Sequence, residues 1–314
     1  MEKLDDLLLF TEVVEHAGFS AAARSLGIQR SKLSRHIADL ENRMGIRLLH
    51  RNTRNVVLTP AGEQVYHHAV ELRQAARNAF SVASDLSSTP QGILRIGCSS
   101  TLAQEALVPI LSLFMQEYPQ IRVIIHVADS NIDLISSKVD LVFRITSKAL
   151  EDSSLIVRPV CAIPMILVAS KNYNNGKVQV EHPSELAAFN YITLGIHENY
   201  VLKDFVHKNG DVLNVQLEPY LSCGNMSVIK SAVKNGMGIA VLPHYLCIDE
   251  LRENQFIEVF SAHSQWSSPD SLMNALLPTR QNVLLVTKLF LDFAMPLLRN
   301  KLTRFDFDIE SLNT

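Results

Sequence analysis

The sequence has no long apolar run, and this absence argues against a membrane protein. The longest strongly apolar run, residues 162–169, contains Pro164 and is far shorter than the roughly 18 residues that a membrane-spanning helix needs. We expect this run to form a buried strand. The first six residues are too acidic for a secretory signal, so the sequence predicts a cytoplasmic protein.

Cysteine is scarce, and motifs for catalysis are missing. No two of the four cysteines have the spacing of metal ligands, and we expect all four to pack as small apolar side chains: Cys98, Cys161, Cys223 and Cys247. A redox-sensing thiol at Cys98 is the alternative. Ser227 and Lys230 match a serine–lysine pattern only by chance, and the glycines around Met237 are typical of a helix end rather than a phosphate-binding loop. The sequence therefore predicts no catalytic residue, metal site or cofactor.

Positive charge is in a slight minority overall but is concentrated near the N-terminus. The chain has 29 basic and 32 acidic residues, a net charge of −3. Between Arg24 and Arg54, eight basic residues accompany two acidic ones, a net charge of +6, which leaves −9 for the remainder. A basic segment on an acidic protein is typical of a surface that contacts phosphates, although a solvated helix face is the alternative.

The same segment has the pattern of a helix-turn-helix. Ser20 can cap a short alanine-rich helix that Gly27 ends, and a second helix begins near Arg30 and ends at Gly45. The second helix has one apolar stripe: Leu33, Ile37, Leu40 and Met44. Its other faces carry basic and hydroxyl side chains suited to a DNA major groove.

The chain then continues as a hairpin and a long helix. Residues 47–50 and 55–58 predict two short strands joined by a basic turn, a wing that can contact the DNA backbone. Thr59 caps a helix to about Ser87, whose small apolar residues recur with heptad spacing: Val65, Ala69, Leu72, Ala76, Ala79, Ala83 and Leu86. We interpret this seam as a dimer coiled coil, with packing on the helix's own domain as the alternative.

From Ile93 onward, strands alternate with helices. Strands are predicted at 94–97, 121–127, 140–145, 165–169, 191–194, 215–221, 238–242 and 272–277, and helices at 102–117, 132–138, 183–186, 226–235 and 280–298. This order predicts mainly parallel sheets in two lobes, joined by two crossing strands, with a cleft between them. The predicted fold is α/β, with a winged helix-turn-helix at 1–59, a linker helix at 60–88, a hinge at 89–92 and a two-lobed domain at 93–314. Lobe 1 covers 93–160 and 266–300, and lobe 2 covers 161–265.

The N-terminal part resembles the LysR-type transcriptional regulators. The resemblance rests on Phe10, Val13, Gly18, Phe19, Ser20, Ala22, Ala23, Leu26, Ile28, Ser34, Arg35, Ile37, Leu40, Glu41, Gly45, Leu48, Arg51, Arg54, Leu58, Thr59, Ala61 and Gly62. The later motifs Tyr118-Pro119, His182-Pro183-Ser184-Glu185-Leu186 and Gly236 to Pro243 extend it more loosely over the rest. The resemblance implies a periplasmic-binding-protein-like effector domain and a sequence-specific regulator of transcription.

DNA-binding residues follow from the helix-turn-helix and the wing: Ser20, Gln29, Arg30, Ser31, Lys32, Ser34, Arg35, Arg51 and Arg54. The family often has glutamine where this chain has Arg30, and a small residue where it has Lys32. Because arginine pairs with guanine and glutamine with adenine, the preferred bases cannot be carried over from relatives. The tail from Arg299 has no strong counterpart in the family.

The resemblance also implies a small effector between the two lobes. By position at strand ends and helix starts, the candidate residues are Ser99, Ser100, Thr101, Arg144, Thr146, Thr193, Gly195 and Asn225. Hydroxyls and free amides there favour anionic or strongly polar groups, although helix capping alone also explains several of them. The expected partners are double-stranded DNA, the effector, RNA polymerase and further copies of the chain, as a dimer through the linker helix and then a tetramer. A two-lobed solute-binding protein and an effector-independent DNA-organising protein are the alternatives.

Overall fold

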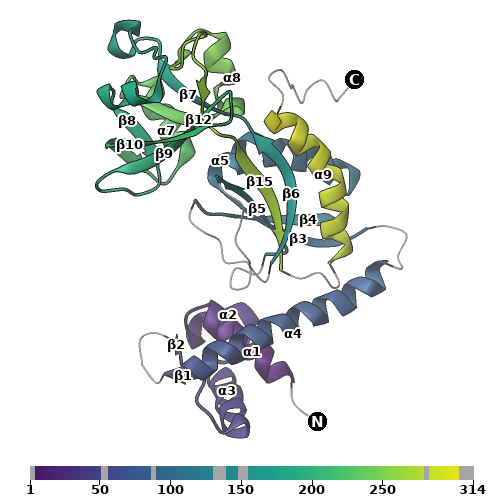
Figure 1. Ribbon diagram of the computed structural model, residues 1–314. Helices are drawn as coiled ribbons and strands as arrows, with labels where there is room; N and C mark the ends of the chain where they lie inside the picture. The colour runs from purple at the N-terminus through teal and green to yellow at the C-terminus, as the bar shows by residue number, and fades with distance from the viewer. Residues whose placement is uncertain are drawn as a thin grey trace. The chain divides into compact units, whose positions relative to one another are not determined.

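The computed structural model describes residues 4–50, 56–85, 90–129, 139–147, 155–278 and 283–303. The chain forms two compact units, shown with their elements in Figure 1. The N-terminal unit comprises mainly the residues up to Pro90, and the C-terminal unit comprises most of the rest. Within the ranges that the structure describes, no helix is long and apolar enough to cross a membrane.

Three helices form the core of the N-terminal unit: α1 (Leu4–Glu15), α2 (Phe19–Leu26) and α3 (Arg30–Met44). Gly27 ends α2 at a φ of 65° and Gly45 ends α3 at a φ of 68°, a left-handed conformation that residues with a β-carbon rarely adopt. Both helix ends were predicted correctly. The three helices bury one shared cluster: Phe10, Val13, Ala22, Ala23, Leu33, Ile37 and Leu40.

Two details of the helix-turn-helix differ from the prediction. Ser20 is the second residue of α2 and not its cap, because the backbone N–H of Ala22 already donates to the carbonyl of Gly18. Phe19 thereby joins the helix and packs against the core. Met44 lies outside the buried stripe with 39% of its surface exposed, because α3 ends there, beyond the side chains that it would contact.

A short hairpin follows α3. Strand β1 (Leu49–His50) pairs antiparallel with β2 (Val57–Leu58), which confirms the two predicted wing strands, although both are shorter than expected. Arg51 and Arg54 lie outside the residues that the structure describes. The long helix α4 (Pro60–Asp85) begins at the predicted cap, since the Thr59 hydroxyl accepts a hydrogen bond from the N–H of Gly62 at 2.9 Å.

The first turns of α4 pack on their own unit. Val65 is partly buried against the helix-turn-helix core and Ala69 is 1% exposed, so both seam positions pack within the chain itself. The alternative interpretation, packing on the helix's own domain, is therefore confirmed for the start of the helix. The side chains of Ala79, Ala83 and Leu86 lie outside the described part of the structure.

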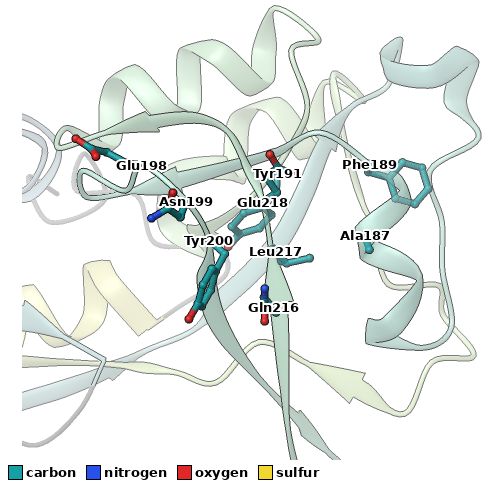
Figure 2. Close-up of a pocket in the computed structure, with 9 residues that line it drawn as sticks. All are labelled: Ala187, Phe189, Tyr191, Glu198, Asn199, Tyr200, Gln216, Leu217 and Glu218. Carbon is teal, nitrogen blue, oxygen red and sulfur yellow. The ribbon is translucent and has the colours of Figure 1, made fainter.

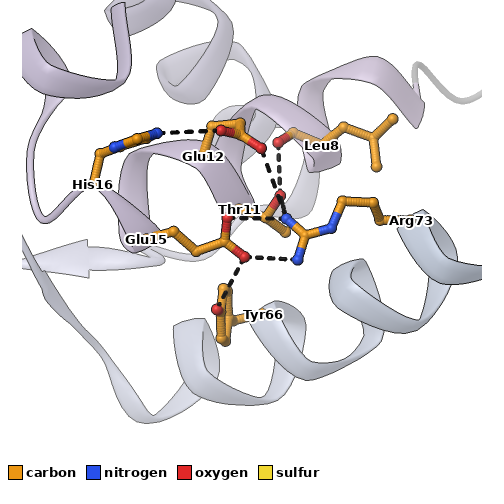
Figure 3. A network of polar contacts seen from close by, with 7 residues as sticks. All are labelled: Leu8, Thr11, Glu12, Glu15, His16, Tyr66 and Arg73. Carbon is orange, nitrogen blue, oxygen red and sulfur yellow. Dashed lines mark hydrogen bonds and ion pairs between the residues drawn. The ribbon is translucent and has the colours of Figure 1, made fainter. Parts of the chain in front are cut away.

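A buried ionic network fixes α4 to α1 (Figure 3). The Arg73 guanidinium lies 2.7 Å from a carboxylate oxygen of Glu15 and 3.7 Å from one of Glu12, and it also donates to the Thr11 hydroxyl at 3.1 Å. The Tyr66 hydroxyl donates to Glu15 from the same helix. Because the Arg73 side chain is only 11% exposed, these contacts hold the linker helix in one orientation on the helix-turn-helix.

The first lobe of the C-terminal unit is a five-stranded sheet. Its strands lie in the order β4 (Ile121–Val127), β3 (Gly92–Cys98), β5 (Leu141–Thr146), β15 (Ser271–Leu277) and β6 (Ile156–Ile163). Strands β4, β3 and β5 are parallel, whereas β15 runs antiparallel to both of its neighbours. Helices α6 (Val108–Glu117) and α9 (Leu285–Thr303) meet through Phe114 and Phe290, whose ring centroids are 5.1 Å apart.

The second lobe contains another five-stranded sheet and a small three-stranded one. The larger sheet has the order β11 (Pro219–Cys223), β8 (Tyr191–Leu194), β12 (Ile239–Pro243), β7 (Met165–Ser170) and β13 (Phe256–Glu258). The smaller has the order β10 (Val212–Leu217), β9 (Val201–His207) and β14 (Trp266–Ser267). The accompanying helices are η2 (Tyr173–Gly176), η3 (Pro183–Ala188), α7 (Met226–Lys234) and α8 (His244–Arg252).

Several predictions for these lobes were wrong in detail. Both large sheets are mixed rather than mainly parallel. The apolar run at 162–169 is not one strand, because Pro164 separates β6 in the first sheet from β7 in the second. The predicted strand at 215–221 is likewise divided at Glu218 between β10 and β11, and the β9–β10 hairpin was not predicted. The predicted helix at 132–138 lies outside the described residues.

Candidate functional site

Helix α3 has a buried face and an exposed polar face. Leu33, Ile37 and Leu40 are 0%, 2% and 3% exposed. The predicted DNA-binding residues of this region are all exposed: Ser20, Gln29, Arg30, Ser31, Lys32, Ser34 and Arg35. Since the buried stripe fixes the rotation of the helix, the basic and hydroxyl groups face away from the protein core.

Not every basic residue of the N-terminal segment is available to phosphates. Arg43 pairs with Asp6, and Arg47 lies 2.7 Å from a carboxylate oxygen of Glu41. Among the described residues, by contrast, Arg30, Lys32 and Arg35 form no ion pair, so the free positive charge is concentrated at the start of α3. This division was not visible in the sequence, because Asp6 lies far from Arg43 along the chain.

A buried carboxylate positions α3 on α1. Asp6, 2% exposed, accepts hydrogen bonds from Arg43 and from the His36 ring nitrogen Nδ1, the latter at 2.7 Å. Burial by itself would raise the pKa of Asp6, but the hydrogen bonds and positive charge of Arg43 and His36 outweigh it and lower this pKa. The charged form of Asp6 therefore stabilises the position of the helix.

Glu41 performs a similar task between α3 and the wing. Its carboxylate accepts hydrogen bonds from the backbone N–H groups of Leu48 and Leu49 at 2.8 and 3.2 Å, and from Arg47. Burial opposes ionisation of Glu41, but the Arg47 and backbone hydrogen bonds prevail, and the pKa of Glu41 is lowered. Glu41 thus fixes the start of β1 relative to α3.

Three of the predicted effector residues meet where the two lobes touch. The amide nitrogen of Asn225, in the second lobe, donates to the hydroxyl of Ser100, in the first, at 2.7 Å. The hydroxyls of Thr101 and Ser227 are 2.9 Å apart across the same junction. Asn225 also caps α7 as expected, because its side-chain oxygen accepts from the N–H of Val228 at 3.0 Å.

Sequence reasoning missed Asp129 and Ser227 in this cluster. Asp129 accepts hydrogen bonds from both Ser100 and Asn225. It lies just beyond the end of β4, the same sheet edge at which β3 leads into Ser99. Applied to β4 as well as to β3, the rule that ligand-binding residues follow parallel strands would have found it.

The other five predicted effector residues have mixed surroundings. Ser99 accepts from the N–H of Leu102 at 3.4 Å, a capping role. Thr193 is 1% exposed and donates to the carbonyl of Leu194 at 3.4 Å. The Thr146 hydroxyl is buried and has no hydrogen-bond partner among the described residues. Two remain: Arg144 lies in β5, half-buried and with interactions of its own, and Gly195 follows β8 at a φ of 103°.

A hollow of about 510 Å³ lies in the second lobe, apart from these residues (Figure 2). Figure 2 shows Glu198, Asn199 and Tyr200 on one side and Ala187 and Phe189 on the other, with Gln216 to Glu218 between them. None of the eight predicted effector residues lines it.

Neither Cys98 nor the serine–lysine pattern has the surroundings of a reactive group. Burial and the nearby Asp129 charge raise the pKa of the Cys98 thiol to about 12, so it stays protonated at neutral pH, unlike a reactive thiolate. Lys230 lies 2.9 Å from a Glu250 carboxylate oxygen and is therefore not a free base for Ser227. In the ranges described, no three histidine, cysteine or acidic side chains come together as metal ligands.

Both parts of the chain match known families. Residues 4–63 match the bacterial regulatory helix-turn-helix protein family of LysR type, and residues 87–297 match the LysR substrate binding domain. The second match covers more than half of the chain. The transcriptional activator AaeR of Escherichia coli (strain K12) is 30% identical over 258 residues, covering 81% of this chain and 82% of that protein. A transcriptional regulator of Xanthomonas campestris pv. campestris (strain 8004) is 29% identical over 98% of this chain and 87% of that protein.

The full-length structure of the Vibrio cholerae virulence activator AphB is also similar. It has 26% sequence identity and a TM-score of 0.59, and the likeness covers 94% of this chain and 99% of that one. AphB is a member of the LTTR protein family. Since family matches cover both the helix-turn-helix and the lobed domain, the chain belongs to the LysR family of transcriptional regulators.

Proposed function

We propose that the exposed start of α3 reads base edges in the DNA major groove. The observation that carries this proposal is the polar row opposite the buried stripe, with Arg30, Lys32 and Arg35 unpaired among the described residues. Gln29, Ser31, Ser34 and the α2 residue Ser20 complete the surface. The wing arginines, Arg51 and Arg54, would contact the phosphate backbone beside it.

Footprinting of the purified protein on its own upstream region, at stated salt, would supply an operator. On that operator, we expect Ser34→Ala and Arg35→Ala each to weaken specific binding by about 1–3 kcal/mol, because each removes a base or phosphate contact. Fluorescence anisotropy with the operator and with an unrelated duplex measures both affinities. Lys208→Ala, which removes an exposed charge from the second lobe, is the matched control and should bind as the wild type does. Unchanged operator affinity in both α3 variants would contradict the assignment of this face.

We further propose that a small effector binds between the lobes and shifts the equilibrium between two arrangements of them. The cross-lobe hydrogen bonds of Ser100, Thr101 and Asn225 support this site. The Thr146 hydroxyl supports it too: it is buried and has no hydrogen-bond partner in the part of the chain that the structure describes, so a ligand could supply one. Ser99, Arg144, Thr193 and Gly195 complete the proposed set. A ligand acts on DNA binding only if its affinity differs between the two arrangements.

The proposed assembly is a tetramer made of two dimers. Because Val65 and Ala69 pack within their own unit, the part of α4 beyond them would pair two chains. The outer strands β4 and β11 and the neighbouring helices α6 and α7 carry exposed apolar side chains that a second effector domain could cover: Val108, Met115, Ile124, Val127, Tyr220 and Val228. We propose that the assembly acts in the cytoplasm by binding rather than catalysis, with RNA polymerase as a further partner.

Tyr220→Asp should reduce the tetramer to a dimer, because it places a charge on an apolar edge strand where 63% of the tyrosine surface is exposed. Sedimentation velocity of the full chain measures the assembly. Leu202→Asp, which changes an equally exposed apolar residue of the small sheet, should leave it unaltered. A tetramer in both variants would remove the β11 edge from the proposed interface.

A further inference from the structure

The carboxylate of Asp129 already accepts hydrogen bonds from groups that were expected to bind an effector anion. The backbone N–H of Ser100 donates to its Oδ1 at 2.9 Å, and the Ser100 hydroxyl lies 2.8 and 2.9 Å from its two oxygens. Both donors belong to the first lobe, as does Asp129. The chain thus supplies its own anion at the start of the segment Ser100–Glu117.

The second lobe completes the site. The side-chain nitrogen of Asn225 donates to Asp129 Oδ2 at 2.6 Å and to the Ser100 hydroxyl at 2.7 Å. The orientation of this amide is fixed, because its oxygen caps α7 at Val228. The hydroxyl pair of Thr101 and Ser227 forms a second link 2.9 Å long. Asp129 is therefore bonded to both lobes at once.

We infer that Asp129 is an internal ligand that holds the two lobes together in the effector-free protein and selects effectors bearing a cationic group rather than a carboxylate. This inference rests on the proposed effector site. A carboxylate brought to Ser100 would find its donors filled and a negative charge beside it, whereas an ammonium group would gain a charge-assisted hydrogen bond. Because the Asp129 side chain is exposed, such a ligand can reach it from solvent.

The ionisation state of Asp129 fits this role. Partial burial opposes its charge, but hydrogen bonds from the Ser100 N–H, Asn225 and the Ser100 hydroxyl outweigh that effect and lower the pKa of Asp129. The carboxylate is therefore negative at neutral pH. Hydrogen bonds to a charged group are about twice as strong as those between neutral groups. The bond from Asn225 to Asp129 is therefore a stronger link between the lobes than the hydroxyl pair of Thr101 and Ser227.

Hydrogen exchange of the full chain, without DNA or ligand, tests the link between the lobes. Asp129→Ala should speed amide exchange about tenfold in residues 99–103 and also in residues 225–229 across the junction. Asp129→Asn keeps an acceptor without the charge and should lie between the alanine variant and the wild type. Asp249→Ala, an exposed aspartate of α8, is the matched control. Faster exchange confined to residues 99–103 would overturn the inference, because Asp129 would then be only a local cap.

Thermal unfolding with two probes tests the ligand class. Benzylammonium and benzoate share a ring and differ in charge. We expect benzylammonium to raise the Tm of the wild type more than benzoate does, and Asp129→Asn to abolish or reverse that order. A wild type that responds equally to both probes, or to neither, overturns the selectivity. Operator binding separates this inference from the proposed DNA-binding function. Asp129→Asn weakens the link between the lobes but leaves the α3 surface intact, so this variant should still bind the operator.

Discussion

Replacement of Arg73 by alanine is expected to lower the free energy of unfolding of the N-terminal unit by about 3–5 kcal/mol, because it removes the guanidinium that compensates the largely buried negative charge of Glu15 and Glu12. Glu15 is 8% exposed and Glu12 is 20% exposed, so water can compensate only partly for the lost guanidinium. The change also frees α4 from α1, which should weaken operator binding by the dimer proposed above, in which this helix joins the two helix-turn-helix units.

The single tryptophan makes this experiment selective. Trp266 packs in the second lobe, so its fluorescence reports that lobe, whereas far-UV circular dichroism also reports the N-terminal helices. In urea, Arg73→Ala should move only the dichroism transition. Arg24→Ala, on the exposed face of α2, is the matched control. Adding Glu15→Gln to Arg73→Ala should recover part of the loss, and an unaltered transition in Arg73→Ala would show that the network contributes little.

Glu41→Ala should lower the free energy of unfolding of the N-terminal unit by about 2–4 kcal/mol. The buried backbone amides of Leu48 and Leu49 each lose an acceptor, at about 1–3 kcal/mol apiece. The start of the wing then moves relative to α3, and specific DNA binding should fall more than non-specific binding. Urea unfolding and anisotropy measure the two effects. Asp39→Ala, which removes an exposed carboxylate from the same helix, is the stability control. Wild-type stability in Glu41→Ala would contradict this role.

Lowering the pH should also reduce the free energy of unfolding of the wild type, because it protonates Glu41. The folded pKa of Glu41 is lowered, so its contribution is complete above the unfolded value and is lost as the pH falls through the lower folded value. Asp6, whose pKa is also lowered, adds to the loss in the same direction. Unfolding curves of the wild type and Glu41→Gln should therefore converge as the pH is lowered below about 4, since protonation removes the charge that distinguishes them.

Local chemistry determined much of the molecule. Gly27 and Gly45 end the two helices of the helix-turn-helix with a left-handed backbone, and each end could be predicted because it depends on a single glycine. The helical spacing of Leu33, Ile37 and Leu40 fixed the exposed face of α3, because these three side chains pack on one side of the same helix. Thr59 and Asn225 were recognised as caps because each bonds a residue three positions further along the chain.

Contacts between distant residues were decided only by the tertiary structure. No periodicity indicates that Arg43 faces Asp6, or that the first seam residues of α4 pack against their own unit. At Pro164 the chain passes from β6 in the first sheet to β7 in the second, and a single apolar run does not indicate that its two halves belong to different sheets. Asp129 shows where the boundary lies: its position after β4 could have placed it at this sheet edge from the sequence, but only folding brought its carboxylate into hydrogen-bond contact with Ser100 and Asn225, because β4 ends beside β3 and the second lobe closes over that edge.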